Sequence, residues 1–296
     1  MYLQHFNFAE PPFSLTPDTQ FFMNQQSHRD ALNTMLVALQ HCEGFIKIVG
    51  EVGTGKTLLC RILLSRLKHR FVTAYIPNPY LSPDELKAFV AQEIGANYDA
   101  SMQAHVLLTS IYHKLMQLAH NGKQVVLVVD EAQAMPRETI ESLRLLTNLE
   151  TEKRKLLQVV MLGQPELDHL LSRADLRQLK QRIIFSETLK PFSTRGVKDY
   201  IRHRLDSAGG NKDLFSGSAL WLLSRGSGGI PRLINIIAHK ALISAYGRGL
   251  TKVGVVQVAA AIIDTTETRW SGKLIAWHCR FASRLLTFGV RAGASV

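Results

Sequence analysis

Three glycines, a lysine and a threonine occur at a fixed spacing between residues 50 and 57. The segment reads Gly-Glu-Val-Gly-Thr-Gly-Lys-Thr and fits G-x-x-x-x-G-K-[S/T] without a mismatch. Glycines let the backbone curl with its N–H groups toward phosphate oxygens, while Lys56 reaches the β- and γ-phosphates and the Thr57 hydroxyl holds Mg²⁺. We therefore expect ATP to be held by Gly50, Glu51, Val52, Gly53, Thr54, Gly55, Lys56, Thr57 and Leu58.

The residues on either side of this segment support the same chemistry. Residues 45–49 form a short apolar run of β type, and residues 58–67 place apolar side chains at helical spacing. A strand, a glycine loop and a helix in this order direct a helix N-terminus toward the bound anion. The pattern therefore predicts a phosphate loop, although a chance match on a glycine turn is the alternative.

A pair of acids follows the apolar run at residues 125–129. Asp130 and Glu131 come directly after four valines and a leucine. Open parallel sheets bind ligands at the carboxyl ends of their strands. We expect Asp130, together with Thr57, to hold Mg²⁺, and Glu131 to act as the general base that polarises the attacking water. The alternative is an acid pair that caps a helix.

A further strand is predicted at 156–162, and Gln164 follows it. A polar side chain at the tip of the strand beside the phosphate loop would contact the γ-phosphate and the attacking water. We expect this role for Gln164, the alternative being a turn residue ahead of Pro165.

Three arginines are candidates for stabilising the charge that develops during phosphoryl transfer. Arg177 and Arg182 lie just ahead of the strand predicted at 183–189, and an arginine given by a neighbouring subunit would stabilise the γ-oxygens. Arg182 is our first choice for this finger and Arg177 the second. Arg232 begins a helix after a glycine turn and would report the loss of the γ-phosphate by moving its domain. For each of them an ordinary helix arginine is the alternative.

The order of elements predicts an α/β fold followed by an all-α segment. Short apolar runs alternate with helical patterns up to residue 190, which is typical of a parallel sheet covered by helices. After Pro191 only helical patterns remain. We expect strands at 45–49, 71–76, 125–129, 156–162 and 183–189, and helices at 27–40, 58–67, 83–95, 101–120, 136–150, 165–181, 194–207, 216–225, 231–246 and 254–264.

Composition limits the class of protein. The 296 residues are 46% apolar, so a sizeable core is expected, and the three cysteines lack the spacing of a metal site or a disulfide framework. The first residues lack the features of a secretory signal, and no run of 18 residues is apolar enough to span a bilayer. We expect a cytoplasmic protein, peripheral at a membrane at most. The net charge of +11 favours an acidic partner without choosing among nucleic acid, membrane and protein.

The last thirty residues have a pattern of their own. Basic and aromatic side chains alternate from Thr268 to Val296, with helical spacing between Leu274 and Phe288. Such a tail lies on an anionic membrane surface or against a partner helix. A packing helix or a disordered end is the alternative.

These motifs, in this order, resemble the AAA+ superfamily of P-loop NTPases. More specifically, the chain resembles the ExeA/GspA-type secretion ATPases, and among them the shorter members that serve a type IV pilus of the mannose-sensitive haemagglutinin type. The resemblance covers about residues 1–266 and rests on Phe13–Asp18, Gly44-Phe45, Gly50–Thr57, Asp130–Gln133, Leu162–Leu167, Leu176–Leu179 and Gly229–Asn235.

The resemblance implies a fold, a division into domains and a role. It implies an AAA+ ATPase core at 1–190 with a parallel five-stranded sheet, a helical lid at 191–266 and a tail of unknown role at 267–296. It also implies a cytoplasmic ATPase that assists pilus or secretion assembly proteins at the inner membrane. A homo-oligomer is expected because Arg182 would act in trans. The larger family members add a membrane segment and a peptidoglycan-binding domain. This sequence shows neither, so we expect no cell-wall binding.

Two other functions remain open. A DNA-binding ATPase, such as a transposition helper, has a similar architecture and is favoured by the +11 charge, but no base-reading module is evident. A nucleotide-gated regulator with little turnover is the third interpretation.

Overall fold

The chain forms two compact units in a computed structural model. The helical unit comprises Met1–Gln25, Gly53–Gly55 and Pro191–Val296, and the sheet unit comprises Gln26–Val52 and Lys56–Lys190. The structure describes residues 1–16, 18–23, 25–42, 44–68, 70–151, 155–268 and 272–279.

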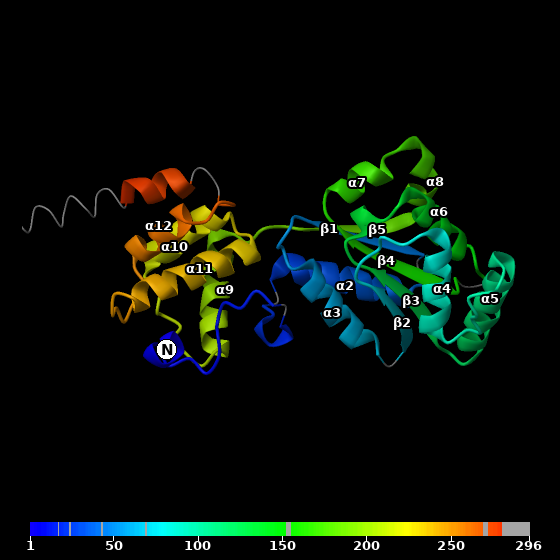
Figure 1. The fold of residues 1–296 in the computed structure, drawn as a ribbon, viewed down its shortest axis with the longest axis horizontal. Coiled ribbons are helices and arrows are strands. Elements are labelled where there is room, and N and C mark those ends of the chain that lie inside the picture. The colour runs from blue at the N-terminus through cyan, green and yellow to red at the C-terminus, as the bar shows by residue number, and fades with distance from the viewer. Residues whose placement is uncertain are drawn as a thin grey trace, which may run out of the picture. The chain divides into compact units, whose positions relative to one another are not determined.

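The sheet unit is built on five parallel strands in the order β2-β3-β4-β1-β5 (Figure 1). The central strands are buried on both faces, as their continuous apolar sequences predict. All five expected strands are present, with ends that shift by no more than one residue: β1 (Phe45–Gly50), β2 (Phe71–Ile76), β3 (Gln124–Val129), β4 (Leu157–Gly163) and β5 (Ile183–Leu189).

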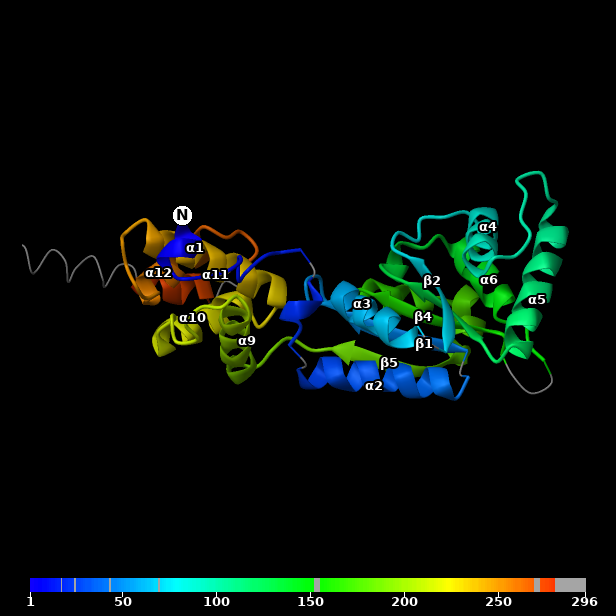
Figure 2. The same ribbon diagram turned by 90° about the horizontal axis from the view of Figure 1, so that it is seen from below.

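Helices cover both faces of this sheet. Val125, Leu127 and Val129 of β3 share an apolar cluster with α4, α5 and α6, whereas α2 and α3 lie on the opposite face (Figure 1). Figure 2 shows α2 running along β5. The helices of this unit are α2 (Gln26–Gln40), α3 (Lys56–Leu67), α4 (Pro83–Ile94), α5 (Ala104–His120), α6 (Arg137–Leu146), α7 (Glu166–Leu171) and α8 (Arg177–Arg182), with short 3₁₀ turns η2 (Ala132–Ala134) and η3 (Ala174–Leu176).

Local sequence explains the ends of α4. The Ser82 hydroxyl accepts a hydrogen bond from the Glu85 backbone N–H (3.3 Å), and the Glu85 carboxylate accepts one from Ser82 N–H (2.7 Å). Gly95 ends the helix in the left-handed conformation, with φ of 71°. By contrast, Ser27, a residue type that often caps helices, lies inside α2, which begins one residue earlier at Gln26. The helical segments expected at about 165–181 are α7, η3 and α8.

The helical unit contains the four helices expected after residue 190. They share one apolar core, to which Phe6, Phe8, Phe13 and Phe21 from the start of the chain also belong. Its elements are α1 (Tyr2–His5), η1 (Thr19–Phe21), α9 (Thr194–Ser207), α10 (Gly217–Ser227), α11 (Pro231–Tyr246) and α12 (Val255–Ile263).

The first 25 residues therefore differ from the predicted domain plan, which placed them in the core at 1–190. A buried guanidinium fixes them. Arg204 of α9 donates from Nε to the Pro12 carbonyl oxygen (2.5 Å) and from Nη2 to that of Ser14 (3.1 Å), and lies 4.2 Å from the centre of the Phe21 ring. Burying a charge requires such partners. Chain order alone does not reveal them.

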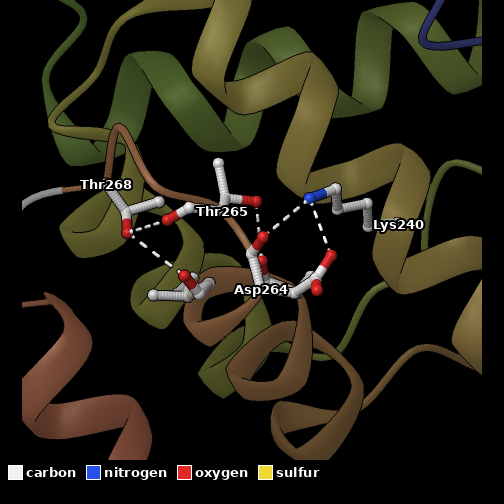
Figure 3. A network of polar contacts seen from close by, with 6 residues as sticks. Lys240, Asp264, Thr265 and Thr268 are labelled. Carbon is white, nitrogen blue, oxygen red and sulfur yellow. Dashed lines mark hydrogen bonds and ion pairs between the residues drawn. The ribbon is translucent and has the colours of Figure 1, made fainter.

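A polar network satisfies the carbonyl groups at the end of α12 (Figure 3). Lys240 of α11 donates to the carboxylate of Asp264 (2.8 Å) and to its carbonyl oxygen (3.0 Å). The Thr265 hydroxyl donates to Ala261 O (2.8 Å), and the Thr268 hydroxyl donates to Thr265 O (2.9 Å). The network fixes the C-terminal end of α12, where backbone carbonyl groups have no partner inside the helix.

Residues 272–279 are helical, within the segment whose spacing predicted an amphipathic helix. The remaining residues of that pattern, at 269–271 and 280–296, lie outside the described residues. Among the residues that the structure does describe, no helix is both long enough and apolar enough to cross a membrane.

We expect Gly229→Ala to destabilise the helical unit strongly. Gly229 has a φ of +79°, and a Cβ there would lie 2.1 Å from the carbonyl oxygen of Phe192, which is backbone. Strain and overlap together should lower the free energy of unfolding by about 3 kcal/mol or more, measured by urea denaturation. Gly249→Ala is the matched control, because Gly249 has a φ of +66° with nothing within 4 Å of its Cβ. Equal losses in the two variants would contradict the steric argument.

Candidate functional site

The phosphate loop leaves the carboxyl end of β1 and enters α3, whose first residue is Lys56. Gly53 and Gly55 have φ angles of +79° and +98°. These values favour glycine, so the glycines at these two positions are required by the curl of the backbone. Curled glycine loops of this kind direct successive N–H groups to one side, which is the arrangement that binds anions.

Lys56 is folded back onto its own loop. Its ammonium donates to the carbonyl oxygens of Gly50 (2.8 Å) and Glu51 (3.1 Å), and the residue is only 5% exposed. Burial lowers the pKa of Lys56, against the opposing influence of the Glu131 and Asp130 carboxylates. An ammonium held by two neutral carbonyl groups is available to a phosphate, which binds it more strongly because the phosphate carries charge.

A hydrogen bond joins the loop to the tip of β3. The Thr57 hydroxyl donates to Oδ2 of Asp130 (2.8 Å), and Oδ1 of Asp130 accepts from the Glu131 backbone N–H (2.9 Å). Burial raises the pKa of Asp130 despite these two hydrogen bonds. Tyr75 of β2 lies beside the same carboxylate: burial, followed by Cys60 and Asp130, raises the pKa of Tyr75 to about 12.

Two amide side chains hold Glu131. Its Oε2 accepts from Gln133 (2.6 Å) and from Gln164 (3.0 Å), and its backbone is left-handed, with φ of 50°. Burial acts to raise the pKa of Glu131, but the hydrogen bonds from Gln164 and Gln133 and the charge of Lys56 outweigh it and leave the pKa below its usual value. The carboxylate is therefore ionised and fixed, although its backbone conformation is one that non-glycine residues adopt at a cost.

Sequence reasoning missed Gln133, which connects the tips of two strands. Its Nε2 donates to Glu131, while its Oε1 accepts from the backbone N–H of Gln164 (2.9 Å). Gly163 leaves room for it, since a Cβ there would lie 3.1 Å from Gln133 Oε1 and 2.8 Å from Leu167 Cδ2. The sequence feature that could have pointed to it is an amide side chain three residues after Asp130. Its backbone partner, Gln164, lies 31 residues further along the chain.

Arg177 and Arg182 lie away from this cluster, at the other edge of the sheet. Ile183 follows Arg182 directly and pairs with Phe45, the first residue of β1, whereas the phosphate loop leaves the last residue of β1. Arg182 donates to the Asn148 side chain, and Arg177 is exposed at the start of α8. The structure does not bring either arginine to the phosphate loop of the same chain.

Arg232 lies in the first turn of α11 in the helical unit. Its backbone N–H donates to the carbonyl oxygen of Gly53 (3.2 Å), a residue that belongs to the same unit by its contacts. The position at a helix start after a glycine turn agrees with the sequence expectation. Its role as a sensor stays a prediction.

The residues present fit a Mg²⁺–nucleotide. The described residues contain no cluster of three or more His, Cys, Asp or Glu side chains that would hold a metal ion unaided. Mg²⁺ is usually held by one or two carboxylates together with substrate phosphates. A hydroxyl and a carboxylate at hydrogen-bonding distance, beside a loop of inward N–H groups, supply the protein's share of such a site.

Comparison with known proteins supports the AAA fold. A protein-family model described as an AAA domain matches residues 40–171. General secretion pathway protein A of Aeromonas hydrophila is 42% identical over 272 residues, which is 92% of this chain and 50% of that protein. The chain thus spans about half the length of this curated relative. The chain has the AAA fold, and the AAA domain matched at residues 40–171 implies nucleotide binding.

Solved structures share this fold at low identity. The ORC1 protein of Aeropyrum pernix, solved in complex with DNA, is 17% identical with a TM-score of 0.64, covering 87% of this chain and 69% of that one. Cdc6p of Pyrobaculum aerophilum is 17% identical with a TM-score of 0.63, covering 84% and 69%. The RuvB branch migration motor of Thermotoga maritima is 15% identical with a TM-score of 0.54, covering 81% and 69%. The predicted fold class, a five-stranded parallel sheet followed by helices, is confirmed.

We expect Asp130→Asn to stabilise the nucleotide-free protein at neutral pH. Burial raises the pKa of Asp130 in the folded protein above its pKa in the unfolded chain. At pH values above the folded-state pKa, the buried carboxylate is ionised and lowers the free energy of unfolding. Asparagine has no charge to bury, so the substitution removes this loss. The gain in the free energy of unfolding should therefore be full at pH 7 and vanish as the pH falls toward about 4, the unfolded pKa.

Urea denaturation across this pH range measures the gain. Asp84→Asn is the matched control, since Asp84 is an exposed acid of the same unit and should change the stability by less than about 0.5 kcal/mol. A stability of Asp130→Asn below that of the wild type at pH 7 would show that the carboxylate's hydrogen bonds outweigh its burial.

Proposed function

We propose that the protein is a Mg²⁺-dependent ATP hydrolase that assists assembly of a type IV pilus or type II secretion machine at the cytoplasmic side of the inner membrane. The hydrolase part is supported by the cluster of Lys56, Thr57, Asp130 and Glu131 at one edge of an AAA-type sheet. The assembly part is supported by the 42% identity to General secretion pathway protein A over 92% of the chain.

Binding uses residues of the phosphate loop and of β3. The loop N–H groups from Gly50 to Leu58 face phosphate oxygens, and Lys56 exchanges two carbonyl partners for the β- and γ-phosphates. Thr57 and Asp130 would hold Mg²⁺, which would neutralise part of the negative charge of the phosphates. The bound cation would then compensate the negative charge of the buried Asp130 carboxylate.

Hydrolysis uses Glu131 as the general base. The two amides that hold Oε2 leave Oε1 of Glu131 as the oxygen that accepts a proton from the attacking water. Gln164 donates to Glu131 and follows β4, the strand next to β1, so it is placed to contact the γ-phosphate as well. Gln133 positions both residues and does not itself contact the reacting atoms.

The finger arginine comes from a second copy of the chain in this proposal. The six residues of β1 separate the two edges of the sheet by about 17–20 Å at about 3.3 Å per residue. An arginine side chain does not span that distance, so in this proposal Arg182, or else Arg177, acts on a neighbouring subunit's nucleotide. This supports an oligomer with shared sites, in which Arg232 reports the state of the nucleotide from the helical unit.

The pilus member MshM, a biogenesis protein of the mannose-sensitive haemagglutinin pilus, is the relative whose role we propose for this chain. The motifs from Phe13 to Asn235 support this choice. Partners would be inner-membrane assembly proteins, with an anionic membrane surface as a second contact through the basic tail.

Glu131→Gln should retain ATP binding and lose at least about 100-fold in turnover, because glutamine keeps the shape of the side chain and cannot accept the proton. ATP binding is measured by calorimetry and turnover by phosphate release. Glu93→Gln is the matched control, as Glu93 is an exposed acid of α4 and this variant should keep its activity. Wild-type turnover in Glu131→Gln would remove Glu131 as the base.

The same phosphate-release assay separates the competing functions. Stimulation by vesicles of anionic phospholipid favours the role at the membrane, and stimulation by double-stranded DNA favours the DNA-dependent ATPase instead. In the source bacterium, cells that carry only Glu131→Gln should lose surface pili or secretion. Normal pili and normal secretion in those cells would contradict the assembly role.

Mixing two inactive variants tests the shared site. Arg182→Ala keeps its own nucleotide site but lacks the finger, and Lys56→Ala lacks the nucleotide site but keeps the finger. A mixture should therefore recover part of the wild-type turnover, measured against each variant alone. Arg177→Ala replaces Arg182→Ala in a parallel mixture, and rescue confined to that pair would identify Arg177 as the finger. Absence of rescue in both mixtures would rule out the trans arrangement.

A further inference from the structure

A groove lies between α9 and α10 of the helical unit, outside the nucleotide site. It encloses a volume of about 510 Å³, enough for one or two side chains of a ligand. All of its lining residues belong to these two helices. The two helices supply opposite chemistry.

The wall from α9 is cationic. Arg195, Lys198 and Arg202 occur at i, i+3 and i+7, so they share one face of the helix. Arg195 is 4.0 Å from Asp199 and 91% exposed, and Lys198 makes no ion pair among the described residues. Arg202 donates from Nη2 to Asp213 (2.5 Å), while its buried Nε has no hydrogen-bond partner within the described part of the chain. This wall therefore retains charge and donor groups that the helical unit does not use.

The wall from α10 is apolar. Gly217, Leu220 and Trp221 occur at i, i+3 and i+4, and the Trp221 residue is 44% exposed. The guanidinium of Arg225 lies 5.7 Å from the Trp221 ring and holds it beside the cationic wall. A Cβ at Gly217 would meet nothing within 4 Å, so the groove is open there. Partly exposed tryptophan beside arginine is the composition that anchors protein interfaces.

We propose that this groove binds a short acidic peptide segment of a protein partner, with one aromatic or large apolar side chain against Trp221 and Leu220. The carboxylates of the peptide would pair with Lys198 and Arg195, and with the exposed part of the Arg202 guanidinium. Charge complementarity supports this occupant, because three cations line the groove with one carboxylate, Asp199, and only Arg202 has a further acidic partner, Asp213, among the described residues. The site extends the proposed function by giving the helical unit a partner contact independent of ATP.

The observations favour a peptide over other anions. A nucleic-acid strand presents phosphates in an unbroken row and stacks its bases on successive aromatic rings, but the groove has one aromatic ring and carries Asp199 among its cations. A lipid surface is flat, whereas this site is a groove between helices. The chain's own last residues are basic, with Arg280, Arg284 and Arg291, and so do not complement the cationic wall.

Gly217 offers a way to close the groove without touching the nucleotide site. Gly217→Glu places a bulky negative charge in the open space, Gly217→Gln adds the same bulk without the charge, and Gly217→Ala adds only a methyl group. Gly217 begins α10, where these residues are tolerated and glutamate is favoured by the helix dipole. Circular dichroism and ATP turnover of all three variants should equal those of the wild type.

The experiment selects peptides of about twelve residues from a random phage-displayed library on the full-length wild-type protein. Selected peptides should be acidic with an aromatic or large apolar residue. Synthesised with a fluorophore, they should bind in anisotropy titrations with an affinity that falls as salt rises. Gly217→Glu should weaken binding at least about tenfold, Gly217→Gln less, and Gly217→Ala by less than about threefold.

Other results would overturn the proposal. Selected peptides that are neutral or basic, that bind Gly217→Glu as well as the wild type, or that do not emerge at all would exclude an acidic peptide site. If oligo-dT or vesicles of anionic phospholipid displace the fluorescent peptide more effectively than unlabelled peptide does, the groove would be assigned to nucleic acid or to membrane. Dissociation of an oligomer by Gly217→Glu in sedimentation, without loss of peptide binding, would assign it to a second copy of the chain. Glu131→Gln should bind the peptide normally, which separates this test from that of the hydrolase.

Discussion

The parallel register of the sheet is the constraint on which the site depends. Hydrogen bonding aligns Val129 of β3 with Met161 of β4, and Gly163 of β4 with Val49 of β1. The carboxyl ends of three strands therefore meet at one edge, and each ends in a different functional group. Because a shift of one residue would move a strand by about 3.3 Å and turn its side chains to the other face, the Thr57–Asp130 hydrogen bond exists only in this register.

The free-energy cost of burying the charged groups at this end of the sheet is offset by contacts with other residues of the same site. Lys56, Asp130 and Glu131 influence one another's pKa, and each is also held by neutral donors or acceptors. The balance differs between the two carboxylates: burial prevails and raises the pKa of Asp130, whereas for Glu131 the two amides and the charge of Lys56 together outweigh burial and lower the pKa. In the proposed mechanism, Asp130 gains from a positive partner, and Glu131 is fixed in place as an anion.

The helical unit has a different physical basis. Its core includes aromatic side chains from the start of the chain, which the buried guanidinium of Arg204 holds by two backbone carbonyl groups and the Phe21 ring. On its surface, the groove between α9 and α10 collects three of the cations that contribute to the net charge of +11. Part of the excess charge thus belongs to a defined surface, where it serves recognition of an acidic segment.

The sequence by itself determined the features that rest on neighbouring residues. The glycine loop at 50–57, the five apolar strands and the capping box at Ser82 depend on backbone freedom, burial and hydrogen bonds within a few positions, so their residue types reveal them. Tertiary structure decided the rest. Pro12 and Arg204 are 192 residues apart, and Gln133 contacts a backbone N–H 31 residues away, so neither contact has a local pattern. The placement of Arg182 at the edge of the sheet opposite the phosphate loop follows from strand direction, which spacing along the chain does not encode.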